Sequence, residues 1–474
     1  MEENQIVELV VDGLGSSGEG VGKIDGFTVF ADGALTGEKV KVKLKKVKKH
    51  YAVGSLVEIL EASKDRAEPV CPVYYKCGGC QLQHLSYEGQ LREKKQQVYD
   101  ALTRIGHLED FEIYDTIGAK NPLNYRNKMQ FPVATNNEGA IKIGCYAKAS
   151  HYVIDVDNCY IQDTKNNDII KVVRKWMNEY KILPYNERNH RGLVRHVMGR
   201  VGEKTGDVMV VLVVTKRDIP HMRELIKMLK AEVPGVKSII QNINKKTGNV
   251  ILGGQNRVLF GKPTIKDKIG NLKFNISAPS FFQVNTKQAE SLYKVALEYA
   301  NLTGKETVVD VYCGTGTITL FLAQKAKKVY GIEIVEEAVF DAQKNADQNR
   351  IENADFLLGD ASRTLEALVE TGVNPDVILL DPPRAGCEQS VLDTIAKVAP
   401  KKVVYVSCNP ASLARDLKVL SDNGYKVNKV QPVDMFHETH HVETVVLMSR
   451  VEKWVCQKSS NIGLFEVWEL KYNV

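Results

Sequence analysis

The sequence predicts a chain of several domains whose C-terminal half is a doubly wound α/β domain, preceded by a small β-barrel and a central α+β region. Three observations support this prediction. After residue 281, short apolar strands alternate with helical stretches, which is typical of a parallel sheet covered by helices on both faces. Residues 1–60 consist of short strands broken by glycine, as in a small antiparallel barrel. With 474 residues, the chain is also too long for one ordinary hydrophobic core.

The composition is that of a globular protein and excludes several classes. No run of about 18 apolar residues occurs, so no membrane span is expected. The N-terminus MEENQIVELV is acidic and strand-like, unlike a secretory leader, which favours a cytoplasmic protein. Nine cysteines are an odd number, which argues against a secreted disulfide framework and points to ligands or catalysis in a reducing compartment.

A basic strand is predicted near the N-terminus. Within EKVKVKLKKVKK, seven lysines between Lys39 and Lys49 alternate with valine and leucine, which places a basic stripe on one face of a strand. The stripe either protects an edge strand or faces the phosphates of a nucleic acid. The glycine placement and the basic strands resemble a TRAM domain, a small RNA-binding barrel. We therefore take Lys43, Lys45 and Lys46 as candidate RNA contacts.

The remaining elements follow in order along the chain. A cysteine-bearing segment leads into the helical LSYEGQLREKKQQVYDALTRIG, after which strands such as KMQFPVA and GDVMVVLVVT alternate with a few amphipathic helices. The strands of the α/β domain are TVVDVYC, KVYGIEI, ADFLLGD, DVILLDPP, KVVYVSC and ETVVLMSR. The predicted domains are the barrel (1–60), the central α+β domain (61–82 and 114–280), the α/β domain (83–113 and 281–450) and a C-terminal extension of unknown role (451–474).

The segment VVDVYCGTGTITLFLA predicts a strand, a glycine turn and a helix that bind a cofactor. Gly314 allows a tight turn, and Glu333 ends the next strand, where a carboxylate can accept hydrogen bonds from both hydroxyls of a ribose. A dinucleotide site would carry a third glycine where this chain has Thr319. The D-x-Y-C-G-T-G form instead resembles the S-adenosylmethionine loop of class I (Rossmann-like) methyltransferases. Two further carboxylates end the third and fourth strands, Asp360 and Asp381.

The fourth and fifth strands indicate the kind of methyl acceptor. Methylases of exocyclic amines carry Asn/Asp-Pro-Pro-aromatic, whereas this chain has Asp-Pro-Pro-Arg384 and a cysteine, Cys408, at the end of the next strand. Carbon 5 of a uracil becomes nucleophilic only after a thiolate adds to carbon 6, and a base must then remove the carbon 5 proton. Glu443, just before the last strand, is the candidate base, and Arg384 can help to form the thiolate. The neighbouring histidines are expected to order the loop rather than bind a metal: His437, His440 and His441.

The motifs DPPRAG, SCNP and HHVETV, in this order and spacing, resemble the RNA uracil-5 methyltransferases, and FFQVN, earlier in the chain, supports a resemblance over nearly the whole chain. The resemblance implies that Cys408 is the nucleophile and Glu443 the proton acceptor. Thr317 stands where some members have asparagine, which puts its contact in doubt, and Cys313 in the cofactor loop is expected to be structural. The resemblance implies these cofactor contacts, with Gly314 forming the turn: Gln283, Tyr312, Glu333, Asp360 and Asp381.

Three cysteines lie close together in Cys71-x5-Cys77-Gly-Gly-Cys80, and a fourth ligand must come from Cys159 or Cys145. Thiolates at this density suit zinc or an iron–sulfur cluster, and unliganded thiols are the third alternative. The ribosomal RNA branch of the family carries a [4Fe–4S] cluster on this pattern, so the resemblance implies such a cluster with Cys159 as fourth ligand. Methyl transfer involves no net redox change, so we expect the cluster to be a structural clamp.

The expected partner is RNA, with no DNA or membrane partner and a monomeric chain. A target uracil must leave its stack to reach the pocket, and Arg126 and Lys128 in NYRNKMQF are further candidate contacts. Arg384 is another candidate. Arg195 and His196 are weaker candidates, for which a structural salt bridge is an equal alternative.

Among RNA classes, 23S ribosomal RNA is the expected substrate. The transfer RNA branch of the family typically lacks both the barrel and the cysteine cluster. Two alternatives remain, a transfer RNA uracil-5 methyltransferase and a non-catalytic iron–sulfur RNA-binding or assembly factor. The set of Cys408, Glu443 and Asp381 argues against the second alternative.

Overall fold

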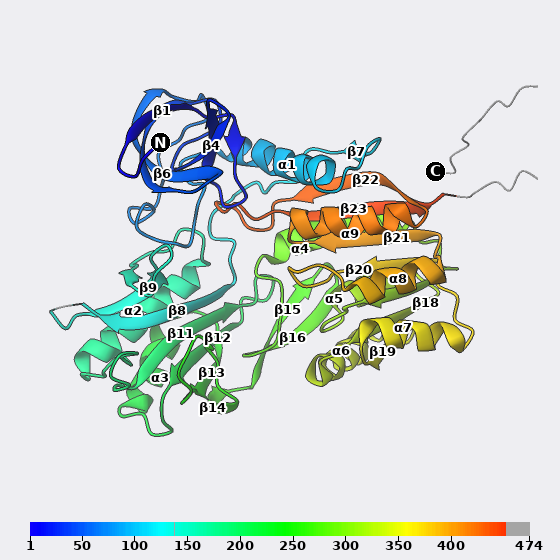
Figure 1. The fold of residues 1–474 in the computed structure, drawn as a ribbon. Coiled ribbons are helices and arrows are strands. Elements are labelled where there is room, and N and C mark those ends of the chain that lie inside the picture. Colours follow the sequence, from blue (N-terminus) through cyan, green and yellow to red (C-terminus); the bar gives the residue numbers. More distant parts are fainter. Residues whose placement is uncertain (137, 452–474) are drawn as a thin grey trace, which may run out of the picture.

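The computed structural model describes residues 1–136 and 138–451, which form a barrel, a central sheet and a C-terminal sheet (Figure 1). The predicted C-terminal extension, 451–474, lies outside the described residues apart from Val451. None of the helices in the described part of the chain combines the length and apolar character needed to cross a membrane.

The helices are α1 (Tyr87–Arg104), α2 (Thr164–Glu179), α3 (Met222–Glu232), α4 (Thr286–Ala300), α5 (Thr317–Ala323), α6 (Glu336–Asn349), α7 (Ala361–Glu370), α8 (Gln389–Val398) and α9 (Pro410–Asp422). The strands are β1 (Ile6–Val10), β2 (Gly13–Leu14), β3 (Gly20–Ile24), β4 (Phe27–Asp32), β5 (Lys39–Val47), β6 (Tyr51–Glu61), β7 (Glu112–Ile113), β8 (Lys128–Thr135), β9 (Ile141–Tyr146), β10 (Val153–Asp155), β11 (Val194–Val201), β12 (Val208–Val214), β13 (Val236–Ile243), β14 (Gln255–Gly261), β15 (Thr264–Ile269), β16 (Leu272–Ser277), β17 (Thr307–Val311), β18 (Lys328–Glu333), β19 (Ala354–Leu358), β20 (Val377–Leu380), β21 (Lys402–Ser407), β22 (Tyr425–Val433) and β23 (Glu443–Arg450).

The N-terminal strands form one six-stranded sheet in the order β1-β5-β6-β4-β3-β2. In β5, Val40, Val42 and Leu44 are fully buried, while the lysines between them point outward. This alternation buries one face of the strand and leaves the basic stripe on the other, as the sequence predicts. An ion pair of 2.7 Å between Lys148 and Asp32 ties the barrel to the central domain.

The central domain is a seven-stranded sheet in the order β10-β9-β8-β11-β12-β13-β14, with α2 and α3 packed on it. Every residue of β12, VMVVLVV, is buried, because this strand is covered on both faces. The strand β11 was not predicted, although all eight of its residues are also buried. Its arginines and histidine interrupt the pattern of apolar residues from which the other strands could be recognised.

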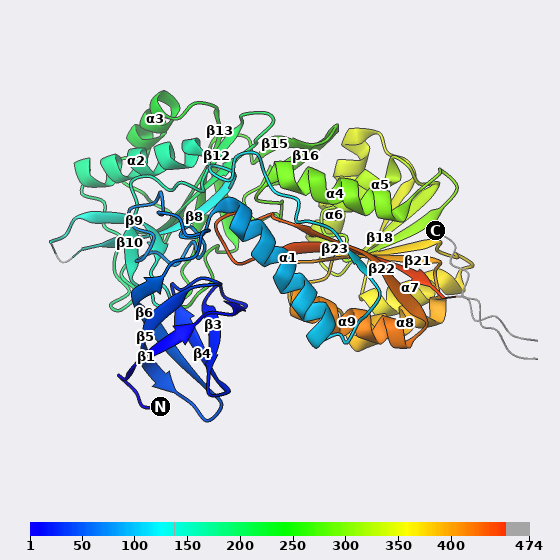
Figure 2. The same ribbon diagram turned by 90° about the horizontal axis from the view of Figure 1, so that it is seen from above.

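The C-terminal sheet has eight strands in the order β19-β18-β17-β20-β21-β23-β22-β7. The first five are parallel, and β23 inserts antiparallel between β21 and β22. Helices α4, α5 and α6 cover one face, and α1, α7, α8 and α9 cover the other (Figure 2). The carboxyl ends of the parallel strands therefore meet at one edge of the sheet, where ligands of such sheets bind.

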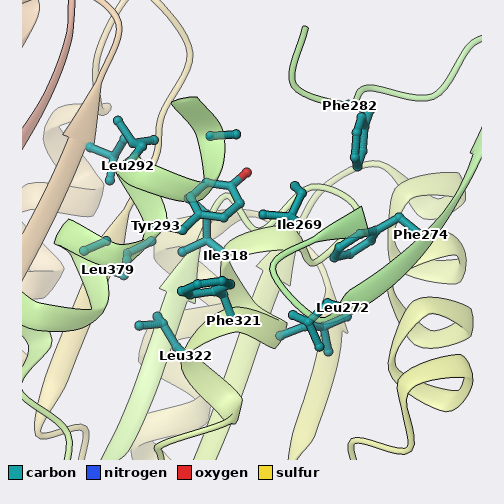
Figure 3. Packing of buried hydrophobic residues seen from close by; sticks show 14 of the residues in the cluster. Ile269, Leu272, Phe274, Phe282, Leu292, Tyr293, Ile318, Phe321, Leu322 and Leu379 are labelled. Atoms are coloured by element: carbon teal, nitrogen blue, oxygen red, sulfur yellow. The ribbon is translucent and has the colours of Figure 1, made fainter. Parts of the chain in front are cut away.

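The ribbon β15–β16 bridges the central and C-terminal sheets. Figure 3 shows Ile269 and Phe274 from this ribbon beside Tyr293 of α4 and Phe321 of α5, in one buried cluster. Because side chains alternate along a strand, the opposite face of the ribbon carries its polar residues. The domain boundary predicted at residue 281 lies just beyond this ribbon.

The strand β22 was also missing from the predicted elements. Its sequence YKVNKVQPV lacks clear alternation and contains Pro432. Proline is tolerated here because the outer neighbour β7 has only two residues, so that most of β22 borders the sheet edge.

Candidate functional site

The turn after β17 leaves space at the sheet edge. Tyr312 has a φ of 73° and Gly314 a φ of 55°, so the backbone turns through the left-handed region. A Cβ built on Gly314 would meet nothing within 4 Å, whereas one on Gly316 would lie 3.0 Å from the ring of Phe356. Gly316 is therefore needed for packing, and Gly314 borders open space in which a ligand can approach the backbone.

Glu333 holds this turn in place. Its carboxylate accepts hydrogen bonds from the backbone N–H of Gly314 (3.0 Å), Ile334 (2.9 Å) and Val335 (2.9 Å). A carboxylate has about four acceptor positions, so one remains for a ligand hydroxyl. Glu333 thus lies at the glycine turn after β17.

Three acidic side chains with raised pKa values meet at the same edge. Burial raises the pKa of Asp310 to about 8, helped by repulsion from Asp381 and Glu333. Burial likewise raises the pKa of Asp381 to about 7, and burial together with Asp381 raises that of Glu443 to about 8. Carboxyls crowded in this way suit a ligand that carries positive charge. Asp310 was not predicted as a site residue, because it lies within β17 rather than at its end.

Cys408 and Glu443 face each other across paired strands. Ser407 of β21 is the register partner of Thr444 of β23, so the residue after one strand lies beside the first residue of the other. Burial, together with repulsion from Glu443 and Asp381, raises the pKa of the Cys408 thiol to about 11, and Arg384 opposes this rise. Glu443 is only 7% exposed. The structure therefore brings together the predicted thiol, base and arginine.

The loop that carries Arg384 is fixed by the helix that follows Cys408. Asn409 caps α9 and donates its side-chain amide to the Arg384 carbonyl at 3.0 Å, and Ser412 donates its hydroxyl to the same oxygen at 3.1 Å. The guanidinium lies 2.7 Å from Nδ1 of His441, whose pKa is lowered to about 3, chiefly by burial. A neutral imidazole can accept from the guanidinium, so His441 orients Arg384, in line with the loop-ordering role expected for the histidines.

A buried ionic network supports the loop before Glu443. Lys94 of α1 donates to Asp434 at 2.5 Å, and both side chains are at most 1% exposed. Asp434 also accepts from His437 Nδ1 at 2.6 Å and from the Tyr87 hydroxyl at 3.0 Å. Asn285 donates to His437 Nε2 at 3.2 Å. The network joins the first helix of the C-terminal domain to the loop between β22 and β23.

The cysteine segment contacts the same loop. The backbone N–H groups of Gln81 and Leu82 both donate to the Glu438 carbonyl, at 2.9 Å and 3.0 Å. Gln90 donates its amide to the Glu438 carboxylate at 3.0 Å. A Cβ on Gly18 of the barrel would lie 3.6 Å from His440. The barrel and the cysteine segment therefore both border the loop between β22 and β23.

Two further predicted cofactor residues, Gln283 and Asp360, have different surroundings. Gln283 hydrogen bonds the Tyr293 hydroxyl, which lies 2.9 Å from the Thr317 hydroxyl. The Gln283 carbonyl accepts from Asn127 at 3.0 Å. Asp360 is exposed and caps α7 by accepting from the Arg363 N–H at 3.1 Å, apart from the group of buried acids.

Five cysteine thiols gather between the cysteine segment and the central sheet. Cys77 forms an isolated β-bridge with Ala147. A hydrogen bond with the Cys145 thiol lowers the pKa of Cys77 to about 7. Burial raises the pKa of Cys159 to about 11, with repulsion from Cys77 and Cys71, and Cys159 in turn raises the pKa of Cys80. Over residues 1–136 and 138–451, no three Cys, His, Asp or Glu side chains are arranged to hold one metal ion.

The predicted RNA contacts divide into free and paired lysines. Lys39 and Lys41 form ion pairs with Glu8 (3.4 Å) and Glu58 (2.8 Å). Lys43, Lys45 and Lys46 are exposed and form no ion pair within the described residues.

A second group of cations lies in the central sheet. Lys128 is directly opposite Arg200 across β8 and β11, and its pKa is lowered to about 8 by burial, Arg200 and Arg126. Like charges opposite each other destabilise a sheet, so this group suits an anion. Arg200, which donates to the Ala278 and Ser280 carbonyls, was missed because nothing in its motif marks it.

Arg195 and His196 are both buried. Arg195 donates to the carbonyls of Asn244 (3.2 Å) and Lys246 (2.5 Å) and lies over the Tyr185 ring. Arg195 therefore has a structural role in which it binds backbone carbonyls and packs on a ring, rather than forming a salt bridge.

Comparisons with known proteins agree with this arrangement. A model of the tRNA (uracil-5-)-methyltransferase family matches residues 86–451, and a TRAM domain model matches residues 1–57. An uncharacterized RNA methyltransferase of Clostridium acetobutylicum is 53% identical over 455 residues, covering 96% of this chain and 99% of that protein. An uncharacterized RNA methyltransferase of Halalkalibacterium halodurans is 50% identical over 448 residues, covering 94% and 98%.

Among solved structures, the chain resembles the Pyrococcus abyssi tRNA (uracil-54, C5)-methyltransferase in complex with S-adenosyl-L-homocysteine. The TM-score is 0.74 with 26% identity, over 93% of this chain and 99% of that one. Together with the TRAM match, this likeness confirms the predicted fold class, a class I methyltransferase domain with a barrel and a central α+β domain.

Proposed function

Because the chain belongs to the tRNA (uracil-5-)-methyltransferase family, we propose that it methylates carbon 5 of a uridine in 23S ribosomal RNA through a covalent adduct with Cys408. The family membership makes it an S-adenosylmethionine-dependent RNA methyltransferase. One observation carries the proposed mechanism: Cys408 and the buried Glu443 face each other at the edge where the acids of the sheet meet.

The residues at this edge fit S-adenosylmethionine. Its sulfonium is cationic, and Asp310, Asp381 and Glu443 surround the site with carboxyls held partly neutral by burial. In the proposal Glu333 accepts from one ribose hydroxyl, while Gln283, Tyr312 and Asp381 contact the rest of the cofactor and Asp360 adds a weaker contact. When bound, the cofactor supplies an electrophilic methyl group.

The protein's own residues then carry the reaction at the uracil. The Cys408 thiol loses its proton to solvent and the thiolate sulfur bonds carbon 6, so that the electrons of the C5–C6 double bond move to carbon 5. Carbon 5 would then take the methyl group as the bond between that group and the cofactor's sulfur breaks. Glu443 removes the proton from carbon 5, and the electrons of that C–H bond re-form the double bond as the C6–S bond breaks. Arg384 lowers the pKa of the thiol and so favours both its ionisation and its departure.

Cofactor binding is expected to release protons. In the free protein Asp381 has a pKa of about 7 and Glu443 one of about 8, and a bound cation lowers both. The carboxyls therefore ionise on binding, and affinity should rise by up to about tenfold per pH unit for each carboxyl that ionises, between about pH 6 and 8. Titration calorimetry in buffers of different ionisation enthalpy measures the released protons. S-adenosylhomocysteine, which lacks the sulfonium charge, should show a smaller rise; equal pH dependence for both ligands would contradict this explanation.

The Pyrococcus abyssi neighbour, a tRNA (uracil-54, C5)-methyltransferase, favours transfer RNA as the second candidate. Mass-spectrometric mapping of 5-methyluridine in both RNAs from a deletion strain separates them. The proposal expects the modification to vanish from 23S RNA, and loss from transfer RNA alone would reject it.

We further propose that the cysteine segment holds a [4Fe–4S] cluster through Cys71, Cys77, Cys80 and Cys159. The donor set is all thiol, as such clusters require, and four irons hold their ligands farther apart than a single ion does. The thiols are also near enough to one another to shift each other's pKa values. The cluster would support the segment that donates to the Glu438 carbonyl, as a structural clamp.

Cysteine substitutions identify the fourth ligand. Anaerobically purified protein should contain about four irons and four sulfides per chain. Cys159→Ser should lose most of this iron, whereas Cys145→Ser, the rival thiol, should keep it. Fewer than about three irons in the unaltered protein would reject the cluster, and the opposite pattern of the two variants would make Cys145 the ligand.

The free lysines of the barrel should contribute to RNA binding through phosphates. Replacing Lys43, Lys45 and Lys46 by alanine is expected to lower the slope of log K against log salt by roughly 2, at about 0.7 per contact to single-stranded RNA. Replacing Lys39 and Lys41, which already pair with Glu8 and Glu58, is the matched control and should change the slope less. Fluorescence anisotropy over a salt series measures both, and equal slopes for the triple variant and the unaltered protein would contradict the assignment.

A further inference from the structure

A lysine-lined cleft lies between the central sheet and α6, apart from the catalytic residues. Its volume is about 720 Å³, and it runs between the β13–β14 edge, the outer face of the β15–β16 ribbon and α6. Four lysines line it, from four different elements or connections: Lys237, Lys262, Lys266 and Lys344. Only two acids line it, Asp207 and Asp341.

The lysines of the cleft form no close ion pairs, although Lys344 and Asp341 of α6 are near enough for their charges to attract. All four are exposed, and none forms an ion pair within residues 1–136 and 138–451. Asp207 accepts the backbone N–H of Lys266 at 3.2 Å instead of pairing with a side chain. The cleft therefore presents free positive charge to a ligand.

Apolar and aromatic surface lies among these charges. The partly buried ring of Phe260, which has the Lys230 ammonium 4.5 Å from its centroid on one face, lines the cleft together with Val236 and Pro263. The ammonium of Lys344 lies 3.8 Å above the ring of Phe340, which is 60% exposed. Positive charges beside aromatic rings are the surface on which single-stranded nucleic acids bind, with phosphates on the cations and bases stacked on the rings.

Both walls of the cleft continue into the catalytic site. The ribbon ends at Ser277, which lines the cleft, and the chain reaches Gln283 six residues later. On the other wall, Asn345 of α6 lines the cleft and donates to the Thr315 carbonyl in the cofactor turn at 3.1 Å. Figure 3 shows that the other face of the ribbon, with Ile269 and Phe274, is turned into the core. The polar face of the ribbon is therefore free to contact a ligand that extends from the catalytic edge into the cleft.

We propose that this cleft binds a single-stranded stretch of the RNA substrate that flanks the target uridine. The inference rests on the proposed function for the identity of the substrate. It adds a second contact surface, in which Lys262, Lys266 and Lys344 neutralise phosphates and Phe260 stacks on a base.

The test measures binding of fluorescein-labelled twelve-nucleotide oligouridylate to the full-length protein without cofactor, so that it does not depend on catalysis. The triple variant Lys262→Ala, Lys266→Ala, Lys344→Ala should weaken binding at least about tenfold at low salt and lower the salt slope by roughly 2. Phe260→Leu, which keeps apolar packing but removes the stacking ring, should weaken binding several-fold with an unchanged slope.

Matched variants separate the possible results. Lys305→Ala, Lys325→Ala and Lys327→Ala, at the opposite edge of the sheet, remove the same charge and should leave affinity within about twofold. An equal loss in both triple variants, or no loss in either, would overturn the proposal. Inorganic phosphate that binds with the same lysine dependence, while the oligonucleotide does not, would also overturn it. If the cleft variants lose oligouridylate but no uridine is methylated by the unaltered protein, the cleft stands and the proposed function fails.

Discussion

Replacing Glu443 by glutamine is expected to stop the reaction after methyl transfer, with the RNA still attached to Cys408. Glu443 is the carboxyl beside the thiol, and its pKa of about 8 places it near the operating pH, where a general base works best. Glutamine keeps the shape but cannot remove the carbon 5 proton, so elimination fails. Turnover should fall about 10³-fold, within the usual range for a lost base, and an RNA–protein band should remain in denaturing gels.

A second carboxyl, on the loop that precedes Glu443, provides the control. Glu438 is 8% exposed, and its carboxylate accepts from Gln90 rather than facing the thiol. Glu438→Gln should therefore turn over without accumulating the adduct. Turnover by Glu443→Gln at an unreduced rate, or release of methylated RNA without a covalent band, would assign the proton to another group.

Replacing Lys94 by methionine is expected to destabilise the C-terminal domain by about 3–5 kcal/mol. The substitution leaves Asp434 fully buried without its ammonium partner, and desolvation of an unpaired carboxylate is costly. The loss corresponds to a fall in melting temperature on the order of 10 °C for a domain of this size. Differential scanning calorimetry measures it. The same loop leads directly into Glu443, the first residue of β23, so catalysis should also weaken.

The adjacent residue offers a matched control for this effect. Lys95 pairs with Asp115 at 2.8 Å, but its side chain is 34% exposed and that of its partner 96%. A surface pair of this kind contributes at most about 1 kcal/mol, so Lys95→Met should hardly change the melting temperature. Adding Asp434→Asn to Lys94→Met should recover part of the loss, because the buried charge is removed. Equal melting temperatures for Lys94→Met and Lys95→Met would contradict a structural role for the network.

The parts of the site that lie at strand ends could be predicted from the sequence. Glu333, Asp381 and Cys408 each follow a short apolar strand, and parallel strands bring such positions to one edge. The lysine stripe of β5 was predictable for the same reason, since strict alternation fixes which face a side chain takes.

Other parts depend on contacts between distant segments, which no local pattern reveals. Lys94 and Asp434 are 340 positions apart, and each looks like an ordinary surface residue in its own segment. The pairing of Lys128 with Arg200 follows from sheet register, and β11 was not recognised as a strand. The lysine-lined cleft combines side chains from separate elements that only the fold brings together.

The central claim is that Cys408 bonds the uracil, and mass spectrometry of a trapped adduct tests it most directly. RNA substituted with 5-fluorouridine is incubated with the protein and S-adenosylmethionine, because fluorine at carbon 5 cannot leave as a proton and elimination is blocked. The account predicts that the peptide containing Cys408 carries a methylated fluorouridine nucleotide, and that Cys408→Ser forms no adduct. An adduct on another cysteine, or methylation of unsubstituted RNA by Cys408→Ser at the rate of the unaltered protein, would contradict it.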